Sequence, residues 1–297
     1  MRFFVSVAAY RDPELLPTVR DLVAKAAAPD ALTVAILNQD DAPVPLSAWP
    51  LGPRYRVETC APAESRGVCW ARARLQRYYD GEDYYLQLDS HHRFVPGWDE
   101  VLVRELARCP SADPLLSAYL PWYRPGKNGD GDRFAPLDGG RLVFSHWDGE
   151  GIANFKAPVI EATAEAPVPG AFVSGHFIFA RGDFVTRVPY DPDIYFTGEE
   201  ITLAARAWTH GFDIFHPVRA AAWHHTDRLE SPRHWDDHAR WPDLQARAVE
   251  KMRRLFADDP YLNAKDGLGT ARTLAAYEQH AGIALRRRGE RSRGPGT

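Results

Sequence analysis

The sequence predicts an α/β fold with a mostly parallel central sheet. Short apolar runs of strand length alternate with segments of helical periodicity through the first 120 residues. The composition agrees, because 45% of the 297 residues are hydrophobic and 26% are charged, as in an average globular domain. No later stretch has the composition of an interdomain linker. We therefore expect one domain over residues 1–284 and a basic, disordered tail over residues 285–297.

Each expected element follows from its residue pattern. The apolar run at 3–8 predicts a buried strand, and a turn at 11–14 leads into a helix that Pro29 ends. Residues 123–169 contain seven glycines without clear periodicity, so we expect a long loop there. Further strands are expected at 32–37, 84–88, 115–119, 172–180, 214–215 and 220–223, and further helices at 68–79, 99–109, 199–210 and 244–256.

Charge and cysteine content exclude several classes of protein. A net charge of −4 argues against a nucleic-acid binder that works by bulk charge. The three cysteines, Cys60, Cys69 and Cys109, do not form a disulfide framework and favour a reducing compartment. No apolar run approaches the roughly 20 residues that span a bilayer, and the run at 3–8 is too short for a signal peptide. We expect a cytoplasmic protein without a transmembrane segment.

The first candidate site follows the strand at 84–88. Asp89 and His91 come directly after it, and ligands of parallel sheets bind beyond the carboxyl ends of the strands. A carboxylate and an imidazole suit Mn²⁺ and other first-row ions. Two residues are a weak metal signal, however, and an Asp89 that caps a turn beside a surface His91 fits the same spacing.

A late group of histidines offers further ligands. His224 and His225 follow an apolar run, so either one is a plausible third ligand for the same ion. His234 and His238 are four residues apart on a possible helix and form a separate candidate pair. Their charged neighbours make an ordinary solvated helix the stronger interpretation of that stretch.

Acidic and basic side chains near these strands have two interpretations each. Glu199 and Glu200 open a helix, where they either complement the helix dipole or place Glu199 in a cleft. Arg66 and Arg72 precede the strand that ends at Asp89, where they could meet a phosphate or form surface salt bridges. The sequence has no Gly-x-Gly-x-x-Gly, Walker loop or Gly-x-Ser-x-Gly, which argues against dinucleotide enzymes, P-loop NTPases and serine hydrolases.

An ordered series of motifs carries a family resemblance. The motifs are residues 4–14, 87–94 with 97–99, 188–192 with 196–200, and 268–273. They resemble the cytoplasmic hydroxyproline-protein N-acetylglucosaminyltransferases (glycosyltransferase family 60). More distantly, the Asp-x-His motif, the Gly-Glu turn and Arg-x-Trp-x-x-Gly at 206–211 are similar to polypeptide N-acetylgalactosaminyltransferases. The resemblance runs from residue 3 to about residue 277 and implies a GT-A fold, a single Rossmann-like domain.

The resemblance also implies an activity. It implies a metal-dependent, retaining glycosyltransferase that moves N-acetylglucosamine from UDP-N-acetylglucosamine to a hydroxyl of a protein or glycan acceptor. The implied cofactor is a divalent metal, Mn²⁺ or Mg²⁺, which holds the donor diphosphate. Two other hypotheses remain open at this point. One is a non-catalytic UDP-sugar-binding protein with this fold, and the other is a metallohydrolase that uses the histidine cluster.

The family motifs assign roles to individual residues. Asp89 and His91 match the metal motif, and the third ligand is a histidine shortly before an arginine, which fits both His224 and His225 ahead of Arg228. Glu199 matches the glutamate that contacts donor-sugar hydroxyls, and we place Glu200 with it as a catalytic residue. The implied donor-binding residues are Arg66, Arg72, Gln87, Asp89, Ser90, Gly175 and Arg228. We expect acceptor contacts near the unmatched glycine-rich segment, at Trp122, Tyr123 and Trp147.

Overall fold

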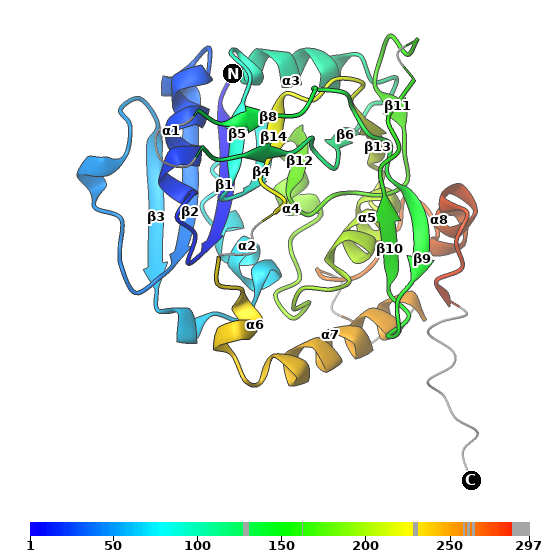
Figure 1. The fold of residues 1–297 in the computed structure, drawn as a ribbon. Coiled ribbons are helices and arrows are strands. Elements are labelled where there is room, and N and C mark those ends of the chain that lie inside the picture. The colour runs from blue at the N-terminus through cyan, green and yellow to red at the C-terminus, as the bar shows by residue number, and fades with distance from the viewer. Residues whose placement is uncertain are drawn as a thin grey trace.

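A computed structural model describes residues 1–126, 131–161, 163–227, 231–257, 259, 262 and 265–286. Within these residues, an eight-stranded sheet has the strand order β11-β13-β6-β12-β4-β1-β2-β3 (Figure 1). Its strands are β1 (Phe3–Tyr10), β2 (Leu32–Gln39), β3 (Arg54–Cys60), β4 (Tyr84–Asp89), β6 (Pro114–Ser117), β11 (Val168–Pro169), β12 (Phe177–Arg181) and β13 (Asp213–His216).

The sheet is mostly parallel, as the sequence predicts. β1 pairs in parallel with both β2 and β4, and β2 does so with β3. β12 is antiparallel to both of its neighbours, β4 and β6, whereas β13 is parallel to β6. The carboxyl ends of β1, β2, β3 and β4 therefore meet at one edge of the sheet, next to the reversed strand.

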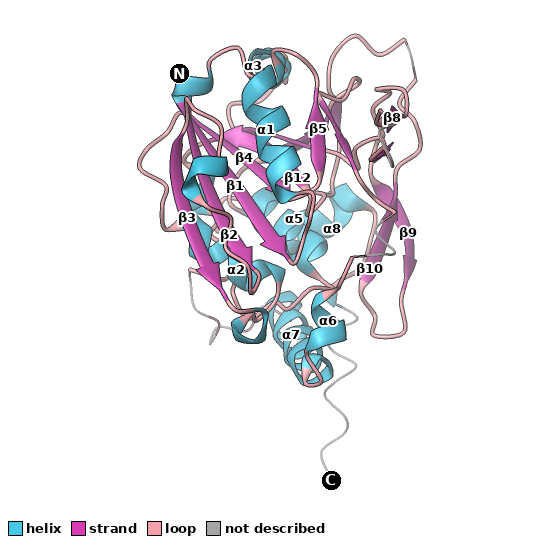
Figure 2. Ribbon diagram, turned by 60° about the vertical axis from the view of Figure 1, so that its left-hand side comes forward, coloured by secondary structure: helices cyan, strands magenta, loops and turns pink. Residues whose placement is uncertain are grey.

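Helices cover both faces of the sheet (Figure 2). The side chains of β1 alternate between two hydrophobic cores, since Phe3 and Val5 enter one and Phe4 enters the other. The first core lies under α1 (Leu15–Lys25) and α3 (Trp98–Ala107). The second lies under α2 (Val68–Gln76), α5 (Glu199–Thr209), α7 (Trp241–Phe256) and α8 (Leu274–Ala281). Two short helices, α4 (Phe184–Arg187) and α6 (His234–Asp237), connect the larger elements.

Several expected boundaries are wrong. The segment at 123–169 is not one loop, because it forms the hairpin of β9 (Val143–Trp147) and β10 (Ala153–Lys156) and the pair of β7 (Tyr123–Arg124) and β8 (Arg133–Phe134). β9 is exposed or half-buried throughout, so no apolar alternation marks it. The strand expected at 172–180 begins only at Phe177. β3, an edge strand with half-exposed residues, and α8 were not expected.

A short ribbon joins the two halves of the chain beside the main sheet. β5 (His92–Phe94) pairs antiparallel with β14 (Ala222–His224). The pairing places His224 opposite His92, directly next to His91. A segment that follows β4 and a segment more than a hundred residues later thus meet at the carboxyl edge.

The end of the described chain packs against the body. Leu285, at the expected start of the tail, is only 1% exposed and belongs to the core. The rest of the expected tail from 287 onward lies outside the described residues. None of the helices in the described part of the chain has the length and apolar character needed to cross a membrane.

Two of the helices that cover the second core, α2 and α5, are preceded by glycines with positive φ. Gly67 precedes α2 with φ 105°, and Gly198 precedes α5 with φ 100°. A Cβ on Gly67 would lie 2.6 Å from the backbone oxygen of Tyr195, so glycine is required for sterics as well as for φ. The turn before α2 therefore packs against Tyr195, in the segment that leads into α5.

We predict that Gly67→Ala lowers the free energy of unfolding by at least about 1 kcal/mol, because the positive φ and the contact with Tyr195 both oppose a side chain. Gly149→Ala is the control, since no atom lies within 4 Å of a Cβ there, and it should stay within about 0.5 kcal/mol of the wild type. Urea denaturation of both variants checks the difference, and equal midpoints would contradict it.

Candidate active site

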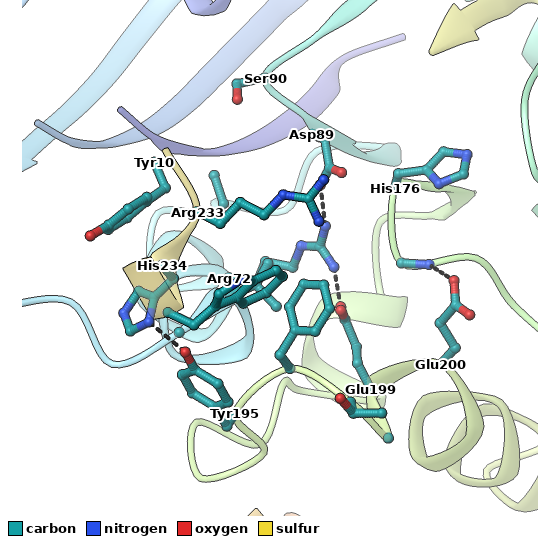
Figure 3. A pocket seen from close by; sticks show the side chains of 18 of the residues that line it. Tyr10, Arg72, Asp89, Ser90, His176, Tyr195, Glu199, Glu200, Arg233 and His234 are labelled. Carbon is teal, nitrogen blue, oxygen red and sulfur yellow. Dashed lines mark hydrogen bonds and ion pairs between the residues drawn. The ribbon is translucent and has the colours of Figure 1, made fainter. Parts of the chain in front are cut away.

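A cavity of about 480 Å³ opens where β1, β2 and β4 end. Its wall near these strands includes Tyr10, Gln39 and Asp89. The beginnings of α2 and α5, strand β10 and the segment at 231–235 also belong to the wall. Figure 3 shows some of these side chains, among them Arg72, Glu199 and Arg233. The cavity therefore lies at the edge where open α/β sheets bind ligands.

A buried arginine organises the floor of this cavity. Arg72, on α2, is 2% exposed and contacts two carboxylates from different parts of the chain (Figure 3). Its Nη2 lies 2.6 Å from Asp89 Oδ1, and its Nη1 donates to Glu199 Oε1. Tyr190 donates to the same oxygen of Glu199 at 2.6 Å. One guanidinium thus faces two carboxylates at this floor.

The expected metal ligands come together at this floor. One ligand atom each from Asp89, His91 and His224 lies within 4.8 Å of the other two. Asp89 Oδ2 is 3.6 Å from His91 Nε2 and 3.5 Å from His224 Nε2. Burial alone would raise the pKa of Asp89, but the hydrogen bond from His224 and the charge of Arg72 hold that pKa well below its usual range. An ionised carboxylate and two imidazoles fit a first-row divalent cation.

The neighbouring histidine has a different place. The backbone N–H of His225 donates to the carbonyl of His91, and its ring packs against Tyr123 with centroids 5.6 Å apart. The grouping of ligand atoms contains His224 and not His225. The geometry therefore favours His224 for the third position that the sequence left open.

Two further histidines, which the sequence analysis did not single out, pack against His224. The ring of His176 stacks on it with centroids 4.0 Å apart, and the His92 ring lies at 4.9 Å. The backbone N–H of Leu120 donates to Nε2 of His176, so Nδ1 carries the proton toward Ser174. Burial and the nearby His224 hold the pKa of His176 well below its usual value. A neutral ring therefore supports His224.

The two glutamates of α5 have different environments. Glu199 is 7% exposed and is held by Arg72 and Tyr190. Glu200 accepts the backbone N–H of Gly175 at 2.9 Å and the hydroxyl of Tyr119 at 2.6 Å. Burial raises the pKa of Glu200 to about 7, partly against those two hydrogen bonds. Both carboxylates line the cavity, and the raised pKa of Glu200 lets that carboxyl group change protonation near neutral pH.

Gly175 and Gln87 complete the floor below the glutamates. A Cβ on Gly175 would lie 2.9 Å from Glu199 Oε2, so the missing side chain leaves room for that carboxylate. Gln87 is fully buried and donates to the carbonyl of Gly175 at 2.6 Å. Gln87 lies beneath the cavity lining and supports Gly175 from below, instead of facing the cavity as a donor-binding residue would.

The other residues that the sequence predicted for the site lie in the cavity lining, outside it, or outside the described part of the chain. Ser90 lines the cavity, and its hydroxyl donates to Asp12. Arg66 is exposed and lies outside the cavity lining, although the next residue belongs to it. Arg228 lies outside the described residues. The three aromatic residues expected near the acceptor also lie outside the lining, whereas Phe155 of β10 belongs to it. Those three are Trp122, Tyr123 and Trp147.

The segment around α6 covers one side of the cavity and was not expected there. Asp237 accepts the Tyr10 hydroxyl at 2.7 Å and the Arg11 guanidinium at 2.8 Å. His234 contacts the Tyr195 hydroxyl at 2.6 Å and stacks on His238 with centroids 3.9 Å apart. The histidine pair thus anchors α6 and stands apart from the grouping at Asp89. In the sequence, only the spacing of four residues between His234 and His238 pointed to this segment.

A mostly parallel sheet with a carboxylate and two imidazoles at its carboxyl edge, beside this cavity, agrees with the class that the motifs resemble, the GT-A glycosyltransferases. The family comparison agrees. The chain belongs to the GlcNAc family, described as Glycosyltransferase (GlcNAc), whose model matches residues 2–48 and 51–287. The protein is therefore an enzyme of the glycosyltransferase class.

Solved structures share the fold. One is a crystal structure of GalNAc-T7 with UDP, GalNAc and Mn²⁺, with a TM-score of 0.60 and 13% identity over 99% of this chain. The match covers 56% of the GalNAc-T7 chain, so this protein spans little more than half of that one. Another is S. aureus TarS 1-349 in complex with UDP-GlcNAc, with a TM-score of 0.54, 13% identity and coverage of 95% and 70%. These likenesses confirm the expected GT-A fold. No curated protein matches the sequence.

We predict that Arg72→Ala lowers the free energy of unfolding by about 3–5 kcal/mol in metal-free buffer, because it leaves the buried Glu199 and the partly buried Asp89 without their counter-charge. Arg74→Ala on the same helix removes a half-exposed ion pair with Glu58 and should cost no more than about 1 kcal/mol. Denaturant unfolding in EDTA measures both, and similar losses would show that Arg72 is not the central charge.

We predict a pH-dependent effect of Glu200→Gln on stability. The folded-state pKa of about 7 lies above the ordinary value of 4.5, so the stability that Glu200 contributes is full below pH 4.5 and is lost as the pH rises to about 7. The neutral glutamine does not titrate. The free energy of unfolding of the variant, relative to wild type, should therefore rise between pH 5 and 7.5, and a constant difference would refute the shift.

Proposed function

We propose that the protein is a metal-dependent, retaining glycosyltransferase that moves N-acetylglucosamine from UDP-N-acetylglucosamine to a hydroxyl acceptor. The observation that carries this proposal is the convergence of Asp89, His91 and His224 beside the buried Arg72, inside a chain of the GlcNAc family. The motif series resembles the hydroxyproline-protein N-acetylglucosaminyltransferases, and TarS was solved with UDP-GlcNAc. The donor sugar rests on these two likenesses.

The cation is proposed from the donor set. Asp89, His91 and His224 would hold Mn²⁺ or Mg²⁺, and GalNAc-T7 was solved with Mn²⁺. Such an ion, when bound, offsets the negative charge that a diphosphate leaving group develops. Asp89 and Glu199 line the cavity beside the grouped imidazoles, and carboxylates at this position favour the approach of a cation.

The remaining residues would bind and orient the donor. Tyr10, Gln39 and Gly67 line the part of the cavity at the ends of β1 and β2, where we place the nucleotide. Glu199 and Glu200 line the part near Gly175, where we place the sugar. Glu199 is fixed by Arg72 and offers its Oε2, while Glu200 offers a carboxyl group that changes protonation near neutral pH. We assign no nucleophile for the retaining step.

The acceptor would enter beside β10 and the segment at 231–235. Phe155, Phe196 and Trp235 line the cavity, and Phe196 is 50% exposed and meets the Trp235 ring edge-on at 5.2 Å. A protein or a glycan hydroxyl fits this aromatic mouth. We also propose one domain, expected over residues 1–284 and here including the buried Leu285. We propose a cytoplasmic location, which the three free cysteines support.

The test is a donor screen that measures release of the nucleoside diphosphate, UDP from UDP-N-acetylglucosamine and other UDP-sugars or GDP from GDP-sugars, with Mn²⁺ or with EDTA. We expect turnover with UDP-N-acetylglucosamine that EDTA abolishes. Asp89→Asn should lower the rate at least about 100-fold, because it removes an anionic contact to the cation at the reacting group. Turnover that is indifferent to EDTA, or a full rate in Asp89→Asn, would refute the cation site.

The neighbouring histidines provide a matched pair of variants. We expect His224→Ala to lose Mn²⁺ affinity by at least about tenfold, whereas His225→Ala should remain within about threefold of the wild type. Isothermal titration with Mn²⁺ in the presence of UDP measures both. Equal losses in the two variants would contradict the assignment of His224 as the third ligand.

A further inference from the structure

Asp12 is a buried acidic side chain whose chemistry no motif assigned. It lies in the turn between β1 and α1, and its side chain is fully shielded from solvent. The chain enters this turn through Arg11, whose φ of 44° is the one positive value among the described non-glycine residues. A left-handed arginine costs of the order of 1–3 kcal/mol. The fold therefore maintains a strained turn immediately before Asp12.

The two oxygens of Asp12 face different partners. Oδ2 lies 2.7 Å from His91 Nδ1 and also accepts the hydroxyl of Ser90. Oδ1 accepts the backbone N–H of Glu14 at 3.0 Å, at the start of α1. A carboxylate can only accept, so Nδ1 of His91 carries the proton. The other ring nitrogen, Nε2, keeps its lone pair, and this is the atom 3.6 Å from Asp89 Oδ2.

We propose that Asp12 is a positioning residue that fixes His91 in the Nδ1–H tautomer and directs its Nε2 toward the divalent cation. The inference rests on the proposed function, because the cation belongs to it. A carboxylate behind a ligating histidine sets the orientation of the ring and raises its basicity. Ser90, from the same Asp-Ser-His motif, holds that carboxylate in place.

The two imidazoles of the grouping therefore differ in their support. His91 is backed by an acidic side chain, whereas His224 is backed by the ring of His176. A negative partner strengthens an imidazole ligand, and a neutral ring only orients it. We expect His91 to be the stronger of the two ligands because Asp12 stands behind it.

The structural alternative is that Asp12 serves only to begin α1 through Glu14. Asp12→Asn and Asp12→Ala separate the roles. Asparagine keeps a carbonyl oxygen that can accept from His91 or from the backbone but lacks the negative charge. Alanine removes all three contacts, with His91, Ser90 and the backbone of Glu14. Asp99→Asn is the matched control, because Asp99 is also buried and accepts the backbone N–H groups of Ala27 and Ala28 far from the cation site.

The first measurement is Mn²⁺ affinity, by electron paramagnetic resonance of the free ion in the presence of UDP. Asp12→Ala should bind about 10–100-fold more weakly than wild type, with Asp12→Asn between the two and Asp99→Asn unchanged. The second is the tautomer of His91 in metal-free protein, by ¹⁵N NMR of the ring. The Nδ1–H form should dominate in wild type and give way to a mixture in Asp12→Ala.

The outcomes are distinguishable. Wild-type Mn²⁺ affinity and an unchanged tautomer in both Asp12 variants would overturn the inference and leave the proposed function standing. A wild type that binds no Mn²⁺ would overturn the proposed cation site, and the inference with it. If Asp12→Ala does not fold, Asp12→Asn and Ser90→Ala carry the test, and a reduced affinity in both with a normal affinity in Asp99→Asn supports the role of Asp12.

Discussion

The buried guanidinium of Arg72 is the interaction on which the rest of the site depends. Arg72 lies on α2. It contacts Asp89 at the end of β4 and Glu199 at the start of α5, so one side chain connects three elements of the fold. A buried cation is tolerated only with such partners. One arginine thus holds two carboxylates from distant parts of the chain, and one of them, Asp89, belongs to the grouping that suits a metal ion.

Particular backbone conformations position the charged side chains of the site. Glycine at position 67 lets the turn before α2 pack against the segment that leads into α5, and the bare Cα of Gly175 leaves space for Glu199. On the other side, the strained Arg11 brings Asp12 behind His91. The charges in the site are therefore held by local turns that only particular residues can adopt, whereas the hydrophobic cores supply the rigid support.

Much of the fold was predictable, because the strands at 3–8, 32–37 and 84–88 are short, largely apolar runs that alternate with helical segments, which is typical of a parallel sheet buried on both faces. The hairpin of β9 and β10 was not, since its exposed strands lack alternation. In the site, the ordered series of motifs predicted that Asp89, His91 and Glu199 belong to one cleft. Pairing across the ribbon of β5 and β14 distinguishes His224 from His225, and adjacent residues carry no such information in the sequence.

The ribbon of β5 and β14 also has a consequence for synthesis. Asp89 and His91 leave the ribosome early, but His224 follows more than a hundred residues later and pairs only then with the segment after β4. At about 5–20 residues per second, several seconds separate these events. A nascent chain therefore carries two of the three grouped side chains for that interval, so the grouping is completed only when the late strand docks. Any product truncated before residue 222 lacks it permanently.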